Sequence, residues 1–157
     1  MGWYHALAAE VGDTPKTIYH MCPKADYEAS QKGKDRVYFP KAYDTDKFTR
    51  ATHEPQRLME TANCFYQASA PADQEWVCLE IDTMGLKVNG IEVKMQDSET
   101  QPELKCPHIY GGLPEEAVKK VYDIQRHKET GEFLFVTGLT DQCGCSGGKA
   151  AAKEVTA

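Results

Sequence analysis

Arg50 and Thr52 form the most concrete candidate for ligand chemistry in this sequence. Because side chains of an extended segment alternate between its two faces, residues two positions apart lie on the same side. A guanidinium beside a hydroxyl, followed by the backbone amides at the start of a helix, is suited to bind a phosphate or a carboxylate. A structural alternative is that Thr52 caps the following helix and Arg50 pairs with a surface carboxylate.

Two histidines and a tyrosine are further candidates for a binding site. His108 and Tyr110 are separated by one residue just before two glycines, so both side chains project from one face of a short strand and could line a pocket. Alternatively, His108 hydrogen-bonds a loop carbonyl and Tyr110 fills the core. His20 lies in a strand-like segment, where a histidine is more often a satisfied core or edge residue than a ligand-binding one.

The sequence lacks the motifs of several common enzyme and metal-site classes. It contains no G-x-x-x-x-G-K-[ST], H-E-x-x-H or paired C-x-x-C, and its single G-x-S-x-G match, Gly144–Gly148, falls in the Gly-rich tail rather than between a predicted strand and a predicted helix. Cys143 and Cys145 supply only two ligands, with no second pair at zinc spacing, so a Gly-rich tail with two thiols is favoured. We therefore expect no metal site and no hydrolase, NTPase or metalloprotease mechanism.

Composition restricts the classes of partner. The chain has 157 residues, 41% of them hydrophobic, and a formal charge of −6 from 24 acidic and 18 basic side chains. An acidic balance offers no field for collecting nucleic-acid phosphates, and no stretch approaches the roughly 20 apolar residues of a membrane helix. The cysteines within patterned segments are expected to be free thiols, Cys64 and Cys78 buried among them. The sequence thus predicts no nucleic-acid partner, no membrane span, no export, and a cytoplasmic or other reducing intracellular location.

Apolar periodicity and turn residues predict the main elements. The segments 17–22, 36–39, 75–82, 91–95, 121–125 and 132–137 are predicted to be extended, 24–32 and 55–69 to be helical, and 115–120 to resemble a helical first turn. Asn89-Gly90 favours a tight reversal, so we expect a hairpin between 86–88 and 91–95. The order indicates a single α+β domain over 17–137, with an N-terminal extension at 1–16 and a flexible Gly/Ala/Lys tail at 138–157.

Three blocks resemble the small family called domain of unknown function 952. They are Ile18–Met21, the run from Phe48 through Thr52 into Gln56–Tyr66, and Cys106–Val118 (C-P-H-I-Y-G-G-L-P-E-E-A-V). The last block is the most specific, and the match spans about residues 17 to 125. The resemblance implies a compact two-sheet fold of the ADP-ribosylation type with short helices. In the family's enzymatic cousins, the cleft between the sheets holds a nicotinamide dinucleotide.

The resemblance also makes His20 a candidate, because folds of this type place a polar side chain there to hold the nucleotide. The family has no established reaction to carry over, and fold analogy is a weak warrant for chemistry. This chain departs from the family pattern: Arg50 and Thr52 stand where the family usually has histidine and serine, and Gln96 stands where a glutamate is common. A glutamine cannot replace a carboxylate that acts as a base or steadies a cation.

These observations lead to three hypotheses. The first is a domain that binds a nucleotide-like or other anionic small molecule, NAD or a related nucleotide among them, without efficient catalysis. Its site would consist of His20, Arg50, Thr52, His108 and Tyr110. The second is an accessory or scaffold subunit with a vestigial cleft, which docks a protein assembly through its termini. The third is an NAD-dependent ADP-ribosyl transferase-like enzyme, against which Gln96 counts most.

Overall fold

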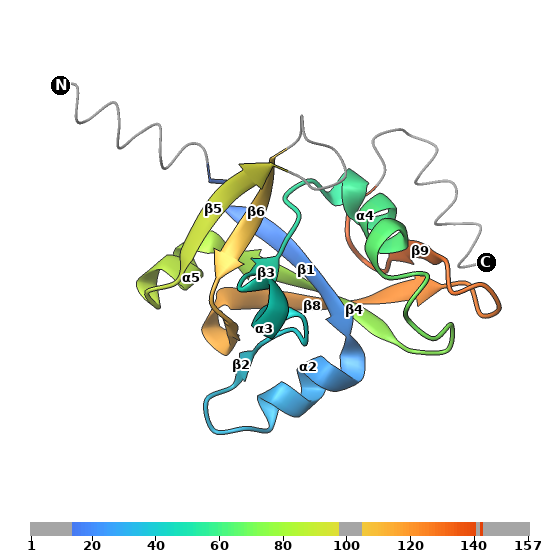
Figure 1. Cartoon of the computed structure of the whole chain (residues 1–157), viewed down its shortest axis with the longest axis horizontal. Helices are drawn as coiled ribbons and strands as arrows, with labels where there is room; N and C mark the ends of the chain where they lie inside the picture. Colours follow the sequence, from blue (N-terminus) through green and yellow to red (C-terminus); the bar gives the residue numbers. More distant parts are fainter. Residues whose placement is uncertain (1–13, 98–104, 141, 143–157) are drawn as a thin grey trace.

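The computed structural model describes residues 14–97, 105–140 and 142, and it folds them into antiparallel sheets with short helices (Figure 1). The strands are β1 (Thr17–Pro23), β2 (Val37–Tyr38), β3 (Thr49–Arg50), β4 (Trp76–Asp82), β5 (Glu92–Asp97), β6 (Lys105–Tyr110), β7 (Leu113–Pro114), β8 (Val118–Arg126) and β9 (Phe133–Val136). The helices are α2 (Lys24–Gln31), α3 (Tyr43–Asp46), α4 (Leu58–Phe65) and α5 (Thr83–Val88), with 3₁₀ turns η1 (Pro55–Arg57) and η2 (Glu115–Ala117). The predicted α+β class is confirmed.

A four-stranded antiparallel sheet in the order β1-β4-β8-β9 carries the core. Along β4, Trp76 and Cys78 pack in the cluster on one face, while Val77, Leu79 and Ile81 pack in the cluster on the other. This alternation is the one that the sequence predicts for a strand buried on both sides. The sheet therefore separates two apolar layers, and elements on both faces are held by hydrophobic burial.

A three-stranded sheet in the order β3-β6-β5 lies beside the first, and β2 and β7 form a separate short ladder. The backbones of Tyr19 and Thr52 exchange hydrogen bonds of 2.7 and 2.8 Å, which link β1 to the segment that follows β3. The predicted two-sheet arrangement is thus only partly right, because the described residues form three sheets. The link places β3 between the larger sheet and β6.

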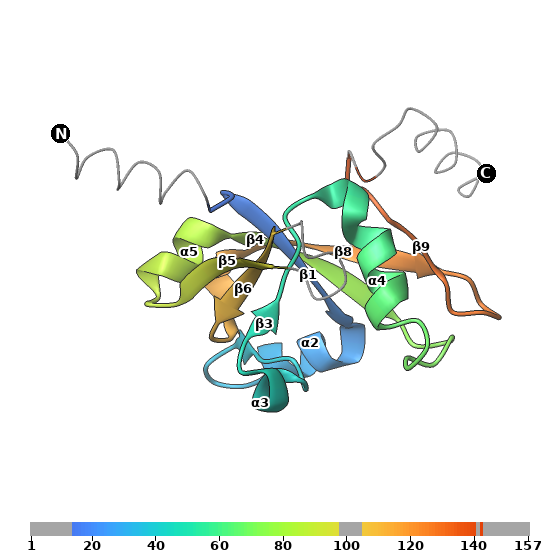
Figure 2. The same cartoon turned by 45° about the horizontal axis from the view of Figure 1, so that its top comes forward.

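Helix α4 packs against the far end of the larger sheet. Leu58 and Ala62, one turn apart, are fully buried, as the predicted helical spacing requires. Asn63 accepts a 2.7 Å hydrogen bond from the Phe133 backbone N–H and donates one of 3.0 Å to its carbonyl oxygen. Both views show α4 beside β9 and set apart from β5 and β6 (Figures 1 and 2). The helix ends at Phe65, four residues before the predicted end.

The predicted hairpin around Asn89-Gly90 is wrong. Residues Thr83–Val88 form helix α5, whose first turn is capped by the Asp82 carboxylate, 3.3 Å from the Met84 backbone nitrogen. Gly90 has a φ of 76°, the left-handed conformation that also follows helix C-termini. Strand β5 pairs with β6, which follows it in the chain, and not with residues 86–88 before it. The helical turn predicted over 115–120 is also shorter than expected, because β8 begins at Val118.

Several predictions fall on residues that the structure does not describe. The segments 1–13, 98–104 and 143–157 contain most of the predicted N-terminal extension and most of the predicted tail, with Cys143 and Cys145. The division into 1–16, 17–137 and 138–157 stays a prediction, as does assembly through the termini. Among the described residues, no helix has both the length and the apolar character needed to cross a membrane.

Candidate functional site

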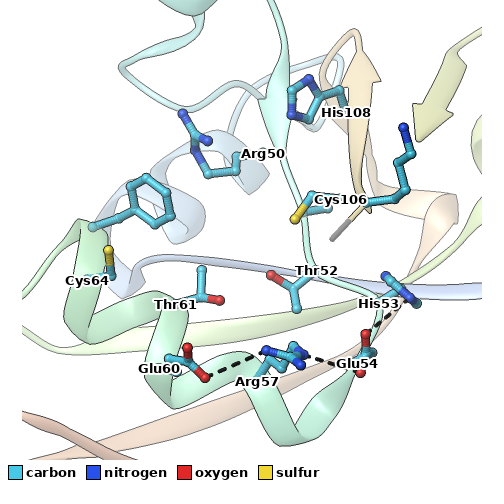
Figure 3. A pocket seen from close by; sticks show the side chains of 13 residues that line it. Arg50, Thr52, His53, Glu54, Arg57, Glu60, Thr61, Cys64, Cys106 and His108 are labelled. Carbon is cyan, nitrogen blue, oxygen red and sulfur yellow. Dashed lines mark hydrogen bonds and ion pairs between the residues drawn. The ribbon is translucent and has the colours of Figure 1, made fainter. Parts of the chain in front are cut away.

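A pocket of about 180 Å³ lies between β3, β6 and helix α4 (Figure 3). Three of the predicted site residues line it together: Arg50, Thr52 and His108. Arg50 and His108 are directly opposed in the register of β3 and β6, and Thr52 follows on the same side as Arg50. The antiparallel pairing of two segments far apart in sequence thus brings the predicted residues to one place.

The Arg50 guanidinium is held by aromatic rings and by a carboxylate. It lies 4.5 Å from the Phe65 ring centroid and 5.4 Å from that of Phe48, within range of cation–π attraction. An ion pair of 3.7 Å joins it to Asp46, and the side chain is 20% exposed. The structural alternative for Arg50, pairing with a carboxylate, is therefore met. The same contacts orient a fixed positive charge at the pocket.

Thr52 does not cap the following helix. The N-cap position of η1 is Glu54, and that of α4 is Arg57, each without a side-chain cap hydrogen bond. Figure 3 shows the side chains of Thr52 and Thr61 in the same part of the pocket, with Arg50 and His108 above them. A hydroxyl group donates one hydrogen bond and accepts others, so these side chains suit the oxygens of an anion.

His108 and Tyr110 share one strand face, as predicted, but only His108 lines the pocket. The His108 ring stacks on Phe48 with centroids 3.8 Å apart and planes 7° apart. Tyr110 lies 6.3 Å from the Phe48 ring centroid, is 38% exposed, and lines neither pocket. Tyr110 therefore lies outside both pockets and does not fill the core either, and its part in a binding site stays a prediction.

Charged residues that sequence reasoning missed surround the smaller pocket. The lining contains three cationic side chains (Arg50, Arg57 and Lys105) against two carboxylates (Glu54 and Glu60). Arg57 lies 3.4 Å from Glu54 and 3.8 Å from Glu60, as the dashed lines in Figure 3 indicate. Arg57, Thr61 and Cys64 recur at helical spacing on the face away from Leu58, a polar stripe that could have indicated this wall. The fixed charges of the lining are positive by one.

A second pocket of about 420 Å³ lies on the other side of Arg50. Its lining includes His20, Tyr38 and Tyr66, and it shares Arg50 and Phe65 with the smaller pocket. This volume falls in the usual range of about 300–1,000 Å³ for small-molecule pockets. Four of the five predicted site residues therefore converge, but His20 enters the larger pocket while Thr52 and His108 line the smaller one.

His20 is buried and uncharged at neutral pH. Its Nδ1 atom lies 2.5 Å from the carbonyl oxygen of Arg50, which fixes the proton on Nδ1 because a carbonyl can only accept. Burial is the main cause that lowers the pKa of His20 to about 4; the hydrogen bond to Arg50 opposes the shift, and the Arg50 charge adds to it. The ring is therefore a neutral imidazole that positions β3 against β1.

The predictions for the cysteines are confirmed in part, and Gln96 lies outside both pockets. Cys22, Cys64, Cys78 and Cys106 are all free among the described residues, and no group of side chains there could hold a metal ion. Cys78 is buried as predicted, but Cys64 is exposed and lines the smaller pocket. Gln96 faces Cys106 across the β5–β6 ladder and lines neither pocket.

Comparison with known proteins gives a family and a fold. The model of a family described as protein of unknown function (DUF952) matches residues 21–121. The crystal structure of protein CC0527 from Caulobacter crescentus is similar with a TM-score of 0.58 and 19% identity, over 74% of this chain and 92% of that one. The solution NMR structure of CC0527 gives a TM-score of 0.55 and 20% identity, over 80% and 95%. No curated protein sequence matches the chain.

Proposed function

The chain belongs to the DUF952 family of proteins of unknown function, and from this starting point we propose that it is a binding domain for an anionic small molecule. The site is the smaller pocket, with Arg50 as its main contact. The observation that carries the proposal is that Arg50, Thr52 and His108 line one pocket with Arg57 and Lys105. These groups supply positive charge and hydrogen-bond donors from three separate parts of the chain.

Arginine is suited to this role because its planar guanidinium carries a permanent charge and five N–H donors. The Phe65 ring at 4.5 Å fixes the orientation of the guanidinium, so less side-chain freedom is lost when a phosphate or carboxylate binds. The 3.7 Å separation from Asp46 exceeds the usual length of a charge-assisted hydrogen bond. An incoming anion can therefore compete with Asp46 for the guanidinium.

A nucleotide-like ligand, NAD or ADP-ribose among them, is the finer form of the proposal. It follows from the family's proposed ADP-ribosylation-type fold and is supported by the presence of a larger pocket on the other side of Arg50. Binding without efficient transfer chemistry is proposed because Gln96, at the position of the family's glutamate, lacks a carboxylate. A reducing intracellular location stays a prediction, supported by the four free described cysteines.

Calorimetric titration with ADP-ribose, NAD and inorganic phosphate tests the proposal on the native chain, Arg50→Ala and Lys119→Ala. Lys119 is an exposed cation whose partner, Asp82, lines neither pocket, so its removal controls for net charge. We expect Arg50→Ala to weaken binding about 10- to 100-fold, the equivalent of a lost charge-assisted contact. Lys119→Ala should bind as the native chain does.

Two outcomes would replace this proposal with the other hypotheses. If none of the three compounds binds the native chain, the binding proposal fails and the accessory or scaffold interpretation takes its place. A sensitive assay for nicotinamide release from NAD covers the enzyme hypothesis. Clear release that His20→Ala abolishes would show that the domain is a catalyst.

A further inference from the structure

The imidazole of His20 has one nitrogen without a hydrogen-bond partner among the residues that the structure describes. Nδ1–H donates to the Arg50 carbonyl oxygen, so Nε2 carries the lone pair and acts only as an acceptor. Among the described residues, no side chain or backbone group hydrogen-bonds to Nε2, although His20 is only 3% exposed. A buried polar atom of this kind is rare in folded proteins, and it points to a donor from outside the chain.

The pocket that His20 lines has several aromatic side chains in its walls. The Tyr38 ring centroid lies 5.8 Å from that of His20, and the ring centroids of Tyr66 and Trp76, in the same lining, lie 4.7 Å apart. Phe65 separates this pocket from the smaller one. Flat rings stack favourably on such walls, because aromatic faces contribute contact area at little entropic cost.

The charges that line this pocket cancel. Lys41 and Arg50 are its cations and Asp26 and Asp46 its carboxylates, and Lys41 pairs with Asp26 at 3.8 Å while Arg50 pairs with Asp46 at 3.7 Å. A net neutral lining with one buried acceptor favours an uncharged group over an ion. This distinguishes the larger pocket from the smaller one, whose fixed charges are positive by one.

We propose that the larger pocket binds an uncharged planar heterocycle bearing an N–H donor, and that Nε2 of His20 accepts the hydrogen bond from that N–H. The inference deepens the proposed function, because one ligand could then place its anionic part in the smaller pocket and its ring in the larger, on either side of Arg50. It does not depend on that function for its test, since a neutral ring can be offered without any phosphate.

The state of His20 agrees with this role. Burial lowers its pKa to about 4, so the imidazole stays neutral and Nε2 keeps its lone pair at physiological pH. Another part of the lining is held by Arg126, whose guanidinium donates to the carbonyl oxygens of Pro71 at 2.7 Å and Gln74 at 2.8 Å, and both of these residues line the pocket. The backbone at Pro71 and Gln74 is thus held in place by a side chain that does not itself line the pocket.

Nitrogen-15 NMR of the His20 ring tests the proposal directly. The probes are two matched pairs: nicotinamide against methyl nicotinate, and adenosine against N6,N6-dimethyladenosine, where the second member of each pair lacks the N–H. We expect at least one N–H-bearing probe to move the Nε2 resonance upfield, as a new hydrogen bond does, while its matched counterpart does not. If neither N–H-bearing probe moves that resonance, the proposal is overturned.

Two variants extend the test to affinity. His20→Gln retains one N–H donor for Arg50 and one oxygen acceptor, so it should bind the active probe within a few-fold of the native chain, whereas His20→Leu should bind it about 10-fold or more weakly. If His20→Leu binds as tightly as the native chain, His20 is not the acceptor. Inorganic phosphate separates the two proposals. If phosphate binds but neither heterocycle does, the heterocycle site in the larger pocket is overturned and the anion site stands. If a heterocycle binds but phosphate does not, the anion site is overturned and the heterocycle site stands.

Discussion

Nδ1 of His20 and the carbonyl oxygen of Arg50 lie 2.5 Å apart, although the two residues are 30 positions apart in the chain. This hydrogen bond joins β1 to β3 at the point where the two pockets meet, since His20 lines the larger one and Arg50 lines both. The backbone of Arg50 is therefore fixed by the buried, neutral His20. The guanidinium of Arg50 is fixed by Phe48, Phe65 and Asp46.

Stability should fall in mild acid because of His20. Its pKa is about 4 in the folded chain and near 6.5 when unfolded, so the unfolded state binds more protons below pH 6.5. The resulting loss in the free energy of unfolding is absent above pH 6.5, and it grows by about 1.4 kcal/mol for each pH unit between pH 6.5 and pH 4. Urea unfolding at pH 7 and pH 5 should show about 2 kcal/mol of acid destabilisation that His20→Gln lacks. An equal pH dependence in both chains would contradict the buried neutral state.

The thiols should react in the order of their exposure. Burial raises the pKa of Cys22 to about 12 and that of Cys78 still further, so neither forms the reactive thiolate at pH 8. Cys64 is exposed and should be alkylated by iodoacetamide well before either of them. Peptide mass spectrometry over a time course measures the order. Modification of Cys78 in the native chain as fast as Cys64 would show that the core assignment is wrong.

Arg126→Lys should destabilise the chain although the charge is kept. The guanidinium bonds the carbonyls of Pro71, Gln74 and Gly131, and a lysine ammonium cannot match that fork. We expect a loss of about 1.5–3 kcal/mol in the free energy of unfolding. Arg36→Lys is the matched control, because the Arg36 side chain forms an exposed ion pair with Glu115 and this substitution should cost under about 0.5 kcal/mol. If both substitutions lower the free energy of unfolding equally, Arg126 does not have the structural role described.

Most of the elements could be predicted from sequence because their apolar patterns are strong. The alternation along β4 and the spacing of Leu58 and Ala62 each report burial directly. The hairpin at Asn89-Gly90 was mispredicted because a positive φ ends helices as well as tight turns, and Gly90 serves the first purpose. Local turn chemistry cannot distinguish the two when the segment before the turn, 86–88, is only three residues long.

The site could be predicted in part. Arg50, Thr52 and His108 share a pocket because β3 pairs with β6, which brings together segments far apart in the sequence. Tyr110 lies outside both pockets because a shared strand face does not fix how far a pocket extends along that face. Cys64 was misplaced because it lies two residues beyond Ala62, about 200° around the helix and away from the core. The separation of His20 into a second pocket depends on side-chain packing that no local pattern carries.

The most direct test of the anion site is an amide-proton NMR titration of the described domain within the full chain, with pyrophosphate as the probe. The account predicts saturable shifts of the Thr52, Thr61 and Cys106 amides and of the Arg50 side-chain N–H in the native chain, with the three backbone shifts strongly reduced in Arg50→Ala. No shift at these positions, or shifts spread over exposed surface cations such as Lys119, would contradict the central claim that the pocket at Arg50 is an anion-binding site.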